Sequence, residues 1–157
     1  MRTTAVELPM SSSDLIKLFF DASVLIAGAH SPTGGSGYLL EACHRGRFKP
    51  VVTRLVLIEA ERNIKAKLGE EDLLRFYQLL GSVDFIVEPP VSAGEIADYS
   101  HLIEEKDAHV LAAAVRSGAQ FLLTLDTKHF MTERLSKADL GLVIVTPGHF
   151  IREHLDV

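Results

Sequence analysis

The sequence predicts an α/β fold, a three-layer α/β/α arrangement around a mainly parallel central sheet. Strand-like and helix-like segments alternate along the chain with short turns between them, which is typical of parallel strands joined by helices on both faces of a sheet. Two of the apolar runs also lead into an aspartate: residues 17–21 end at Asp21, and residues 121–125 precede Asp126. Ligands of open parallel sheets bind outside the carboxyl ends of the strands, so we expect both aspartates to face one crevice.

The first half of the chain contains two expected strands and four expected helices. In order, they are a strand over 17–21, a helix from about Ala22, a helix over 38–46, a strand over 49–53, and helices over 54–68 and 70–80. The last helix has apolar residues at the spacing of one buried face: Leu73, Phe76, Tyr77 and Leu80. Residues 31–37 are expected to break the helical pattern. Within them, the glycine-rich residues 34–37 lack the Lys-Ser/Thr pair of a phosphate-binding loop, and we expect a flexible rim there.

The second half is expected to add three strands and two helices. In order, they are a strand over 85–87, a helix from Ser92 to about Leu102, a helix over 106–117, and strands over 121–125 and 142–145. Ser92 with Glu95 three residues later is a capping box, which marks a helix start. Pro89 and Pro90 stop the strand before it, and Gly118 ends the longer helix.

Length and composition predict one domain with its own core. A chain of 157 residues is long enough to bury roughly two thirds of its unfolded surface. We expect residues 1–16 to form an N-terminal extension that can be flexible and residues 17–157 to form the domain. The single cysteine, Cys43, is expected to be a small buried hydrophobe. No signal peptide is recognisable, and no apolar run approaches the ~20 residues of a membrane span, so a soluble cytoplasmic protein is expected.

The formal net charge of −5 argues against a protein that coats nucleic acid through a broad basic face. It does not argue against a nuclease. A cluster of carboxylates accounts for much of the negative charge, and a divalent cation would reverse the local sign where a phosphate approaches.

Two further acids are placed by helices. Glu59 lies within the apolar residues 55–60, so we expect its side chain to be partly buried and therefore paired, hydrogen-bonded or bound to metal. A salt bridge to Arg62 is the alternative explanation. Asp107 is expected in the first turn of its helix, where capping alone would also explain a carboxylate. Glu104 and Glu105, just before it, are expected in a solvated turn, where one of them could act as an outer-sphere ligand.

Together these segments resemble the PIN domain, a metal-dependent nuclease fold found in VapC-type toxins and in RNA-processing and flap endonucleases. Four segments carry the resemblance and occur in the family's order: residues 20–26 (Phe-Asp-Ala-Ser-Val-Leu-Ile), 53–59, 106–114 and 123–130 (Leu-Thr-Leu-Asp-Thr-Lys-His-Phe). The similarity covers roughly residues 17–151. Residues 145–150 (Val-Thr-Pro-Gly-His-Phe) also fit the toxin-like branch.

The resemblance implies a set of site residues. The acidic quartet that binds metal and carries catalysis corresponds to Asp21, Glu59, Asp107 and Asp126. Ser23 matches a small polar residue of the pocket, where asparagine is also frequent, and Thr124 matches the hydroxyl two residues before the last aspartate. Thr127 stands where some relatives have a further acid, which suggests that a second metal would be weakly held.

The ligand types themselves indicate the metal and the chemistry. Carboxylate oxygens suit Mg²⁺ or Mn²⁺ better than zinc, and such an ion can activate water for attack on a phosphodiester. Our hypothesis is that Asp21, Asp107 and Asp126 hold metal directly, while Glu59 binds a second ion or orients the water. The resemblance implies products with 5′-phosphate and 3′-hydroxyl ends.

Contacts with substrate are expected from basic residues near the strand ends. We single out Arg62 and Lys128 as residues that bind substrate or support the ligands. His129 and His109 are better explained as packing or hydrogen-bonding residues. RNA is favoured over DNA as substrate by family analogy alone, because metal-activated water does not need the 2′-hydroxyl.

Several functions remain open at this point. The resemblance implies an endoribonuclease toxin held by a small antitoxin, and frequently a homodimer, with no membrane partner. An RNA-processing nuclease without an antitoxin, or an inactive PIN fold that binds RNA or protein, are the alternatives. A haloacid-dehalogenase-type phosphotransferase would need an acid where this chain has Ser23, and a response-regulator receiver would need paired acids before its phosphorylated aspartate.

Overall fold

The computed structural model describes residues 14–155 and has an entirely parallel five-stranded sheet with the order β3-β2-β1-β4-β5. The strands are β1 (Lys17–Phe20), β2 (Lys49–Thr53), β3 (Ile86–Glu88), β4 (Phe121–Leu123) and β5 (Val143–Val145). Every neighbouring pair is parallel. This confirms the predicted α/β class with a mainly parallel sheet.

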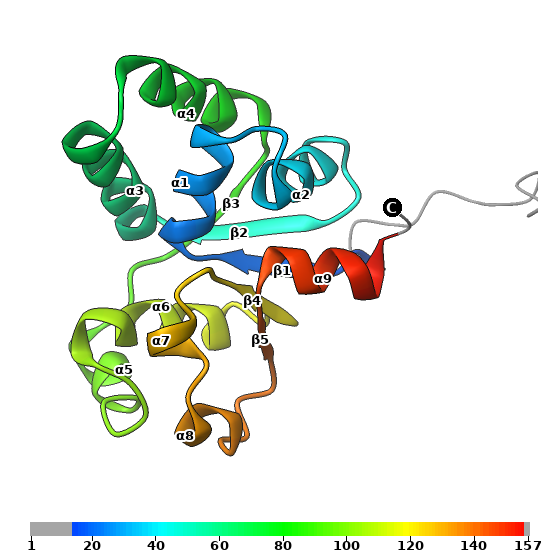
Figure 1. The fold of residues 1–157 in the computed structure, drawn as a ribbon. Coiled ribbons are helices and arrows are strands. Elements are labelled where there is room, and N and C mark those ends of the chain that lie inside the picture. Colours follow the sequence, from blue (N-terminus) through cyan, green and yellow to red (C-terminus); the bar gives the residue numbers. More distant parts are fainter. Residues whose placement is uncertain (1–13, 156–157) are drawn as a thin grey trace, which may run out of the picture.

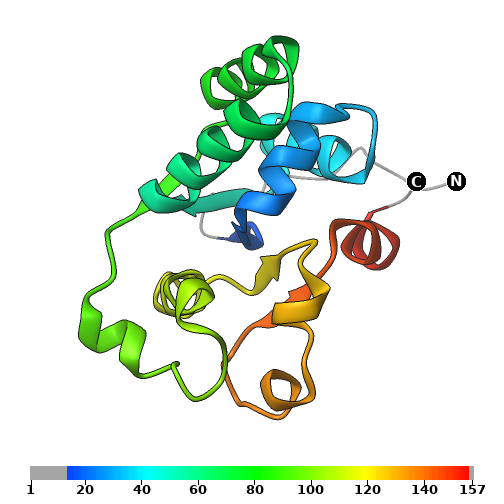
Figure 2. The same ribbon diagram turned by 60° about the vertical axis from the view of Figure 1, so that its left-hand side comes forward.

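Helices cover both faces of the sheet (Figures 1 and 2). On one side lie α1 (Ala22–His30), α2 (Gly35–His44), α3 (Arg54–Lys67) and α4 (Glu70–Ser82), and on the other lie α5 (Ala93–Ala97), α6 (Glu105–Arg116), α7 (Thr127–Phe130) and α8 (Glu133–Ser136). The last helix, α9 (Pro147–His154), packs against α2. The three layers follow because the inner strands β1, β2 and β4 have apolar side chains on both faces to cover.

The central strand β1 is the point where the chain changes direction across the sheet. The chain runs from β1 outward to β2 and β3 on one side, then crosses back to β4 and β5 on the other. Residues of β1 and β4 pair in register, Phe20 with Leu123, so both strands end at the same level. A crevice outside the carboxyl ends of strands at such a switch point is the usual ligand site of open α/β sheets.

The core is built from these strands and the helices that flank them. Leu18, Phe19 and Phe20 of β1 are completely buried, as are Leu122 and Leu123 of β4. Continuous apolar runs of this kind are expected where both faces of a parallel sheet are covered. The core therefore fixes the ends of β1 and β4, and with them the residues that follow each strand.

The glycine-rich segment differs from the flexible rim expected from the sequence. Gly35, Ser36 and Gly37 form the first turn of α2, and Ser36 and Gly37 are buried. A Cβ atom on Gly37 would lie only 2.1 Å from the carbonyl oxygen of Pro32. The glycine is therefore required for close packing of the helix against the preceding turn, which explains why the helix begins three residues earlier than predicted.

Other differences concern short helices. The capping box at Ser92 and Glu95 is present, but α5 ends at Ala97 because the chain continues as turns instead of the predicted helix to Leu102. Three helices, α7, α8 and α9, were not predicted; each begins at a residue whose side chain accepts a backbone N–H, namely Asp126, Thr132 and Thr146.

Of the single residues expected to be buried, some are buried and one is exposed. Cys43 is buried, as predicted, and desolvation raises the pKa of its thiol to about 12. In α4 Phe76 is buried, whereas Tyr77 is 43% exposed because its hydroxyl reaches the carboxylate of Glu61 on α3.

The predicted extension is only partly within the described chain. Residues 1–13 lie outside the described residues, whereas Ile16 packs against the core and its carbonyl accepts a hydrogen bond from Lys49. No helix within residues 14–155 is long and apolar enough to cross a membrane.

Candidate metal centre

The carboxylate of Asp21 sits directly at the end of β1 and is buried. Its backbone is extended, and its side chain caps α1 by accepting the N–H of Ala22 at 2.9 Å. Its Oδ2 atom accepts hydrogen bonds from the hydroxyls of Ser23, at 2.9 Å, and Thr124, at 2.7 Å. A buried carboxylate is costly unless it is satisfied in this way, so the three donors hold Asp21 in one orientation.

Ser23 and Thr124 connect this carboxylate to the end of β4. The N–H of Leu125 donates to the Ser23 hydroxyl at 3.0 Å, and the N–H of Asp126 donates to the Thr124 hydroxyl at 3.0 Å. Each hydroxyl has only one proton, and both protons are directed at Asp21. The two polar residues singled out in the sequence thus join the two strand ends, because each accepts from one segment and donates to the other.

Asp126 follows β4 and caps the short helix α7. Its Oδ1 accepts the backbone N–H of His129 at 3.2 Å, and the imidazole Nδ1 of His129 lies 3.0 Å from Oδ1 and 2.8 Å from Oδ2. The carboxylate is 30% exposed and so remains accessible to solvent. His129, expected to be a packing or hydrogen-bonding residue, has this acid as its direct hydrogen-bond partner.

Asp107 lies in the first turn of α6, as predicted, but helix capping does not account for it. Its Oδ2 atom is buried and has no hydrogen-bond partner among residues 14–155. Desolvation raises the pKa of its carboxyl, the charges of Lys106 and His129 lower it, and those of Asp126 and Asp21 raise it again. A buried, unpaired carboxylate oxygen close to two further carboxylates is what a cation would satisfy.

Glu59 is the most exposed of the four acids. Its side chain on α3 is exposed, not partly buried as expected, because the apolar neighbours Leu55 and Ile58 are themselves exposed. Nearby protein still desolvates the carboxyl enough to raise its pKa, and the charges of Asp21 and Asp107 raise it further.

The alternative salt bridge from Glu59 to Arg62 is not formed within residues 14–155. The charge of Arg62 nevertheless lowers the pKa of the Glu59 carboxyl, as does that of Lys106. Arg62 and Lys128, the two basic residues singled out from the sequence, are both exposed. His109 is half-buried, and desolvation lowers the pKa of its imidazole.

Two further side chains join the acidic group. Glu104, Asp107 and His129 each offer a ligand atom within 4.8 Å of the others, and Nε2 of His129 is 3.8 Å from a carboxylate oxygen of Glu104. Glu104 precedes α6, so the chain turn into that helix brings it beside Asp107. The sequence signal for His129 was its position three residues after Asp126, one turn onward on a short helix.

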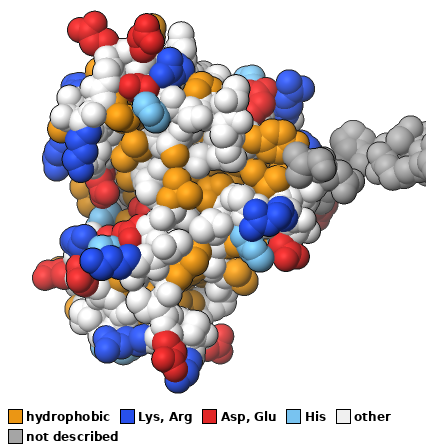
Figure 3. Space-filling model, in the orientation of Figure 1, with side chains coloured by type: hydrophobic (Ala, Val, Ile, Leu, Met, Phe, Trp, Pro, Cys, Tyr) orange, Lys and Arg blue, Asp and Glu red, His pale blue; other side chains and the backbone are white. Residues whose placement is uncertain are grey.

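The donor set fits a hard divalent cation. The carboxylates at the ends of β1 and β4 are near enough for their charges to act on that of Asp107 in α6, one of whose oxygens is buried and unpaired within residues 14–155. Only Asp107 of the predicted quartet belongs to the group with ligand atoms within 4.8 Å of one another. Oxygen ligands suit Mg²⁺ and Mn²⁺, and a nearby imidazole is more compatible with Mn²⁺ than with Mg²⁺. Figure 3 shows acidic, basic and histidine side chains side by side at the left of the molecule, in the region that α6 and α7 occupy in Figure 1.

Comparison with known proteins finds a family and solved structures that share this fold. The sequence profile of the PIN domain matches residues 17–128. No curated protein sequence matches the chain significantly.

Three solved structures illustrate the similarity. One is VapBC2 from Rickettsia felis, bound to a DNA fragment from its promoter, with 14% sequence identity and a TM-score of 0.59; the match covers 83% of this chain and 98% of that chain. The second is PAE2754 from Pyrobaculum aerophilum, with 21% identity and a TM-score of 0.55, covering 87% of this chain and 88% of that chain. The third is FitAB bound to an IR36 DNA fragment, with 14% identity and a TM-score of 0.53, covering 89% of this chain and 98% of that chain. At these identities the similarity shows a shared fold.

Proposed function

This chain belongs to the PIN domain family, and from that premise we propose that it is a metal-dependent endoribonuclease that hydrolyses RNA phosphodiester bonds with Mg²⁺ or Mn²⁺. The observation that carries the proposal is the buried Oδ2 of Asp107, which has no hydrogen-bond partner within residues 14–155 and feels the charges of Asp21 and Asp126. An arrangement of this kind is unfavourable without a cation, since like charges disfavour each other's ionised form.

Each residue has a distinct role in this proposal. Asp21, Asp107 and Asp126 hold the cation, and the hydroxyls of Ser23 and Thr124 orient Asp21. When bound, a divalent cation lowers the pKa of water and neutralises charge on a phosphodiester oxygen. The pKa of the Glu59 carboxyl is raised by desolvation and by the charges of Asp21 and Asp107, and the side chain is exposed, so its carboxylate is suited to accept a proton from the attacking water.

The substrate would approach across the exposed side of the acidic group. Arg62 lies one turn from Glu59 on α3, and Lys128 lies in α7 two residues after Asp126. Both are exposed, and cations in such positions bind phosphates and set the register of a nucleic acid. Their charges offset the repulsion that the carboxylates would exert on the RNA backbone.

We further propose that the chain acts as the toxin of a toxin–antitoxin pair. In this proposal it binds a small antitoxin protein and also pairs with a second copy of itself as a homodimer. The fold is shared with VapBC2 and with FitAB, whose structures were determined with DNA. Large apolar side chains on α3 and α4 are also exposed: Leu55, Ile58, Leu74 and Tyr77. If these side chains form one continuous surface, a protein partner would be expected to cover it.

Two other functions deserve a test beside this one. An RNA-processing nuclease without an antitoxin would have the same site, because function depends on the site's surroundings as well as on the fold. An inactive PIN fold that binds RNA or protein would have no need of a cation. Isothermal calorimetry with Mg²⁺ and Mn²⁺ separates the last possibility, since a non-enzymatic scaffold would bind neither.

The direct test is cleavage of labelled single-stranded RNA, tRNA, and single- and double-stranded DNA with Mg²⁺, Mn²⁺ or EDTA. We expect RNA cleavage that EDTA abolishes and that Asp21→Asn lacks while its melting temperature stays close to that of the wild type. The variant also controls for contaminating ribonuclease, because a contaminant would persist in it. Full activity of Asp21→Asn would refute the assignment.

A further inference from the structure

A hollow of about 410 Å³ opens directly beside the candidate metal centre. Glu104 and His129 form one of its walls, and the same two side chains have ligand atoms within 4.8 Å of Asp107. The hollow and the acidic group therefore share a wall. Its volume falls within the ~300–1,000 Å³ of ordinary small-ligand sites.

Two cations also line the hollow. Lys128 projects from α7 and Arg134 from α8, and neither forms an ion pair within the described part of the chain, residues 14–155. Arg134 is partly fixed, because its Nη1 donates to the carbonyl of His101 at 3.1 Å. Its other guanidinium N–H groups are held in place by this contact but form no further hydrogen bond within residues 14–155, so they can donate to a phosphate.

A comparison with Arg116 shows the difference from a structural arginine. The guanidinium of Arg116 contacts the carboxylates of Glu88, at 2.8 Å, and Glu95, at 3.0 Å, as well as two proline carbonyls. It ties the segment after β3 to α6 and has little capacity left for a ligand. Arg134 makes one neutral contact and faces a hollow.

The rest of the lining is aliphatic apart from one hydroxyl, and it suits a base. Leu102 and Ile103, from the turn before α6, contribute aliphatic surface, and Thr132 contributes a hydroxyl. That hydroxyl accepts the N–H of Leu135 at 3.2 Å as the cap of α8, so its proton is free to be donated. An apolar face with a few fixed polar groups is the usual composition of a small-ligand site.

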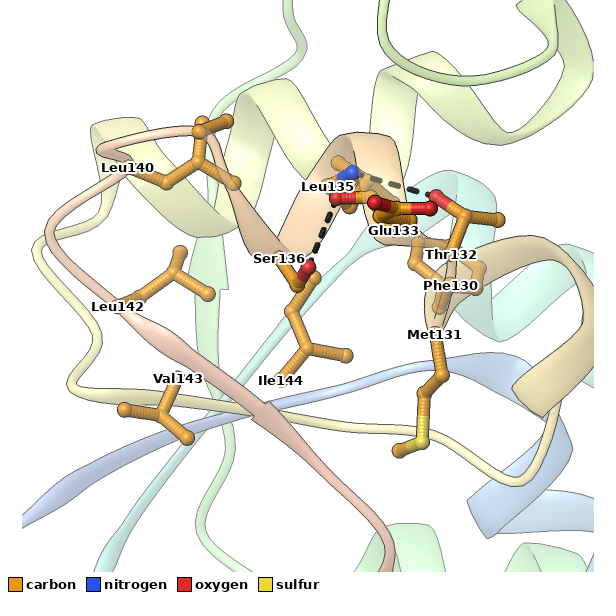
Figure 4. Close-up of a pocket in the computed structure, with 11 residues that line it drawn as sticks. Phe130, Met131, Thr132, Glu133, Leu135, Ser136, Leu140, Leu142, Val143 and Ile144 are labelled. Carbon is orange, nitrogen blue, oxygen red and sulfur yellow. Dashed lines mark hydrogen bonds between the residues drawn. The ribbon is translucent and has the colours of Figure 1, made fainter.

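A larger hollow on the same side of the molecule lacks these features. It measures about 650 Å³ and lies between β5 and the α7–α8 segment (Figure 4). Its lining is mainly aliphatic, with Leu140, Leu142 and Val143 on one side, and its one charged residue is the acid Glu133. No basic side chain lines it, so it is unsuited to a phosphodiester.

We propose that the hollow formed by Leu102, Ile103, Lys128, Thr132 and Arg134 is the subsite for the nucleotide next to the cleaved bond of single-stranded RNA. Its phosphate binds between Lys128 and Arg134, and its unstacked base lies on the aliphatic wall. Single strands fit because their bases can leave the stack and enter a pocket, which bases within a duplex cannot do. This inference rests on the proposed nuclease function. It implies that the RNA strand runs from the acidic group toward α8.

The test compares two double variants with the same loss of positive charge. One is Lys128→Ala with Arg134→Ala; the control is Lys137→Ala with Arg152→Ala, whose residues are exposed and lie outside the hollow. Binding of a short fluorescein-labelled single-stranded RNA is measured by anisotropy over a range of salt concentrations, with Asp21→Asn added to all proteins to prevent cleavage. Circular dichroism melts confirm that each protein is folded.

The expected result is specific to the first double variant. Each phosphate neutralised on a single strand contributes about 0.7 to the slope of log K against log salt, so losing the one phosphate held between Lys128 and Arg134 lowers the slope by about 0.7. With Asp21 restored, we expect the same variant to raise KM for RNA cleavage at least tenfold while kcat changes little. The control should match the parent in both measurements.

The outcomes separate this subsite from the nuclease function. Unchanged slope and KM in the first double variant, with RNA still cut, would overturn the subsite and leave the nuclease intact. Equal losses in both double variants would also overturn it, because the effect would then be one of total charge. A reduced slope in the first variant alone, in a protein that cuts no RNA, would support the subsite as a nucleotide-binding site and refute the nuclease.

Discussion

The imidazole of His129 lies against both carboxylate oxygens of Asp126, with Nδ1 2.8 Å from Oδ2 and 3.0 Å from Oδ1. The backbone N–H of the same residue donates to Oδ1. Because Asp126 is a proposed metal ligand, His129 would determine which way its free lone pairs point. Partners of this kind orient metal ligands and are therefore part of the affinity of a metal site.

The first prediction concerns that contact. His129→Ala should weaken Mg²⁺ and Mn²⁺ binding by about 10–100-fold, the usual effect of losing a residue that supports a metal ligand. His129→Asn should retain most of the affinity, because its amide nitrogen lies near the position of Nδ1. Calorimetric titration measures both, with melting temperatures as the fold control. Wild-type affinity in His129→Ala would contradict the assigned role.

The second prediction concerns the hydroxyl that joins the two strand ends. Thr124→Val keeps the shape of the completely buried side chain but leaves the N–H of Asp126 without its acceptor and Asp21 without one donor. We expect a loss of about 1–3 kcal/mol in the free energy of unfolding, measured by urea denaturation. Thr124→Ser restores the hydroxyl and should recover more than half of the loss; equal stability of Val and Ser variants would count against the network.

The third prediction is a pH dependence of the metal-free protein. Burial raises the pKa of the Asp107 carboxyl above the ~3.9 of an unfolded chain. Between these two values the folded state binds more protons than the unfolded state, so the free energy of unfolding falls as the pH rises through that interval. Glu59 contributes with the same sign. The destabilisation is complete above the folded-state pKa, and therefore present at neutral pH.

Asp107→Asn removes the contribution of Asp107 to this effect. In EDTA at neutral pH, we expect the variant to be more stable than the wild type and its stability to vary less between acidic and neutral pH. With Mg²⁺ the order should reverse, because only the wild type gains binding free energy in the folded state. Urea denaturation at several pH values, with and without Mg²⁺, measures both. A wild type that is more stable than the variant in EDTA would exclude the electrostatic strain.

The fourth prediction concerns the glycine-rich turn. Gly37→Ala would place a Cβ atom 2.1 Å from the Pro32 carbonyl oxygen, and the backbone would have to move to relieve it. Overpacking of this kind typically costs about 1–3 kcal/mol. Gly81→Ala, inside α4 with open space around the Cβ position, is the matched control and should gain roughly 0.5–1 kcal/mol from helix propensity. Similar thermal stabilities of the two variants would contradict the close packing.

The fold and the ends of β1 and β4 were predictable because of how completely these strands are buried. A strand with both faces covered must be apolar along its whole length, so the aspartates that follow Phe20 and Leu125 stand out in the sequence. The short helix α7 was not predictable in the same way, since four residues are too few for a periodic pattern. The contact between His129 and Asp126 depends on that helix and was missed with it.

Exposure was harder to predict than position. Glu59 was expected to be partly buried because its neighbours are apolar, yet Leu55 is 52% exposed and Ile58 38% exposed. Apolar residues on a helix indicate burial only if a neighbouring element covers that face, and sequence alone does not show whether one does. The same limit applies to the glycine-rich turn, whose packing against Pro32 depends on a contact between backbone atoms.

The last prediction uses this exposure to separate two roles for Glu59. If its carboxylate accepts the proton of the attacking water, Glu59→Gln should lower kcat by about 10²–10⁴-fold while the affinity for the first Mg²⁺ stays within a factor of two or so of the wild type. A ligand of that ion would behave differently, because its loss would weaken metal binding and high Mg²⁺ would restore kcat. Cleavage rates across a Mg²⁺ titration distinguish the two, with Glu61→Gln, two residues away on the same helix, as the control for local charge. Recovery of Glu59→Gln at high Mg²⁺ would assign the residue to the metal, and wild-type kcat at every Mg²⁺ concentration would remove it from the site.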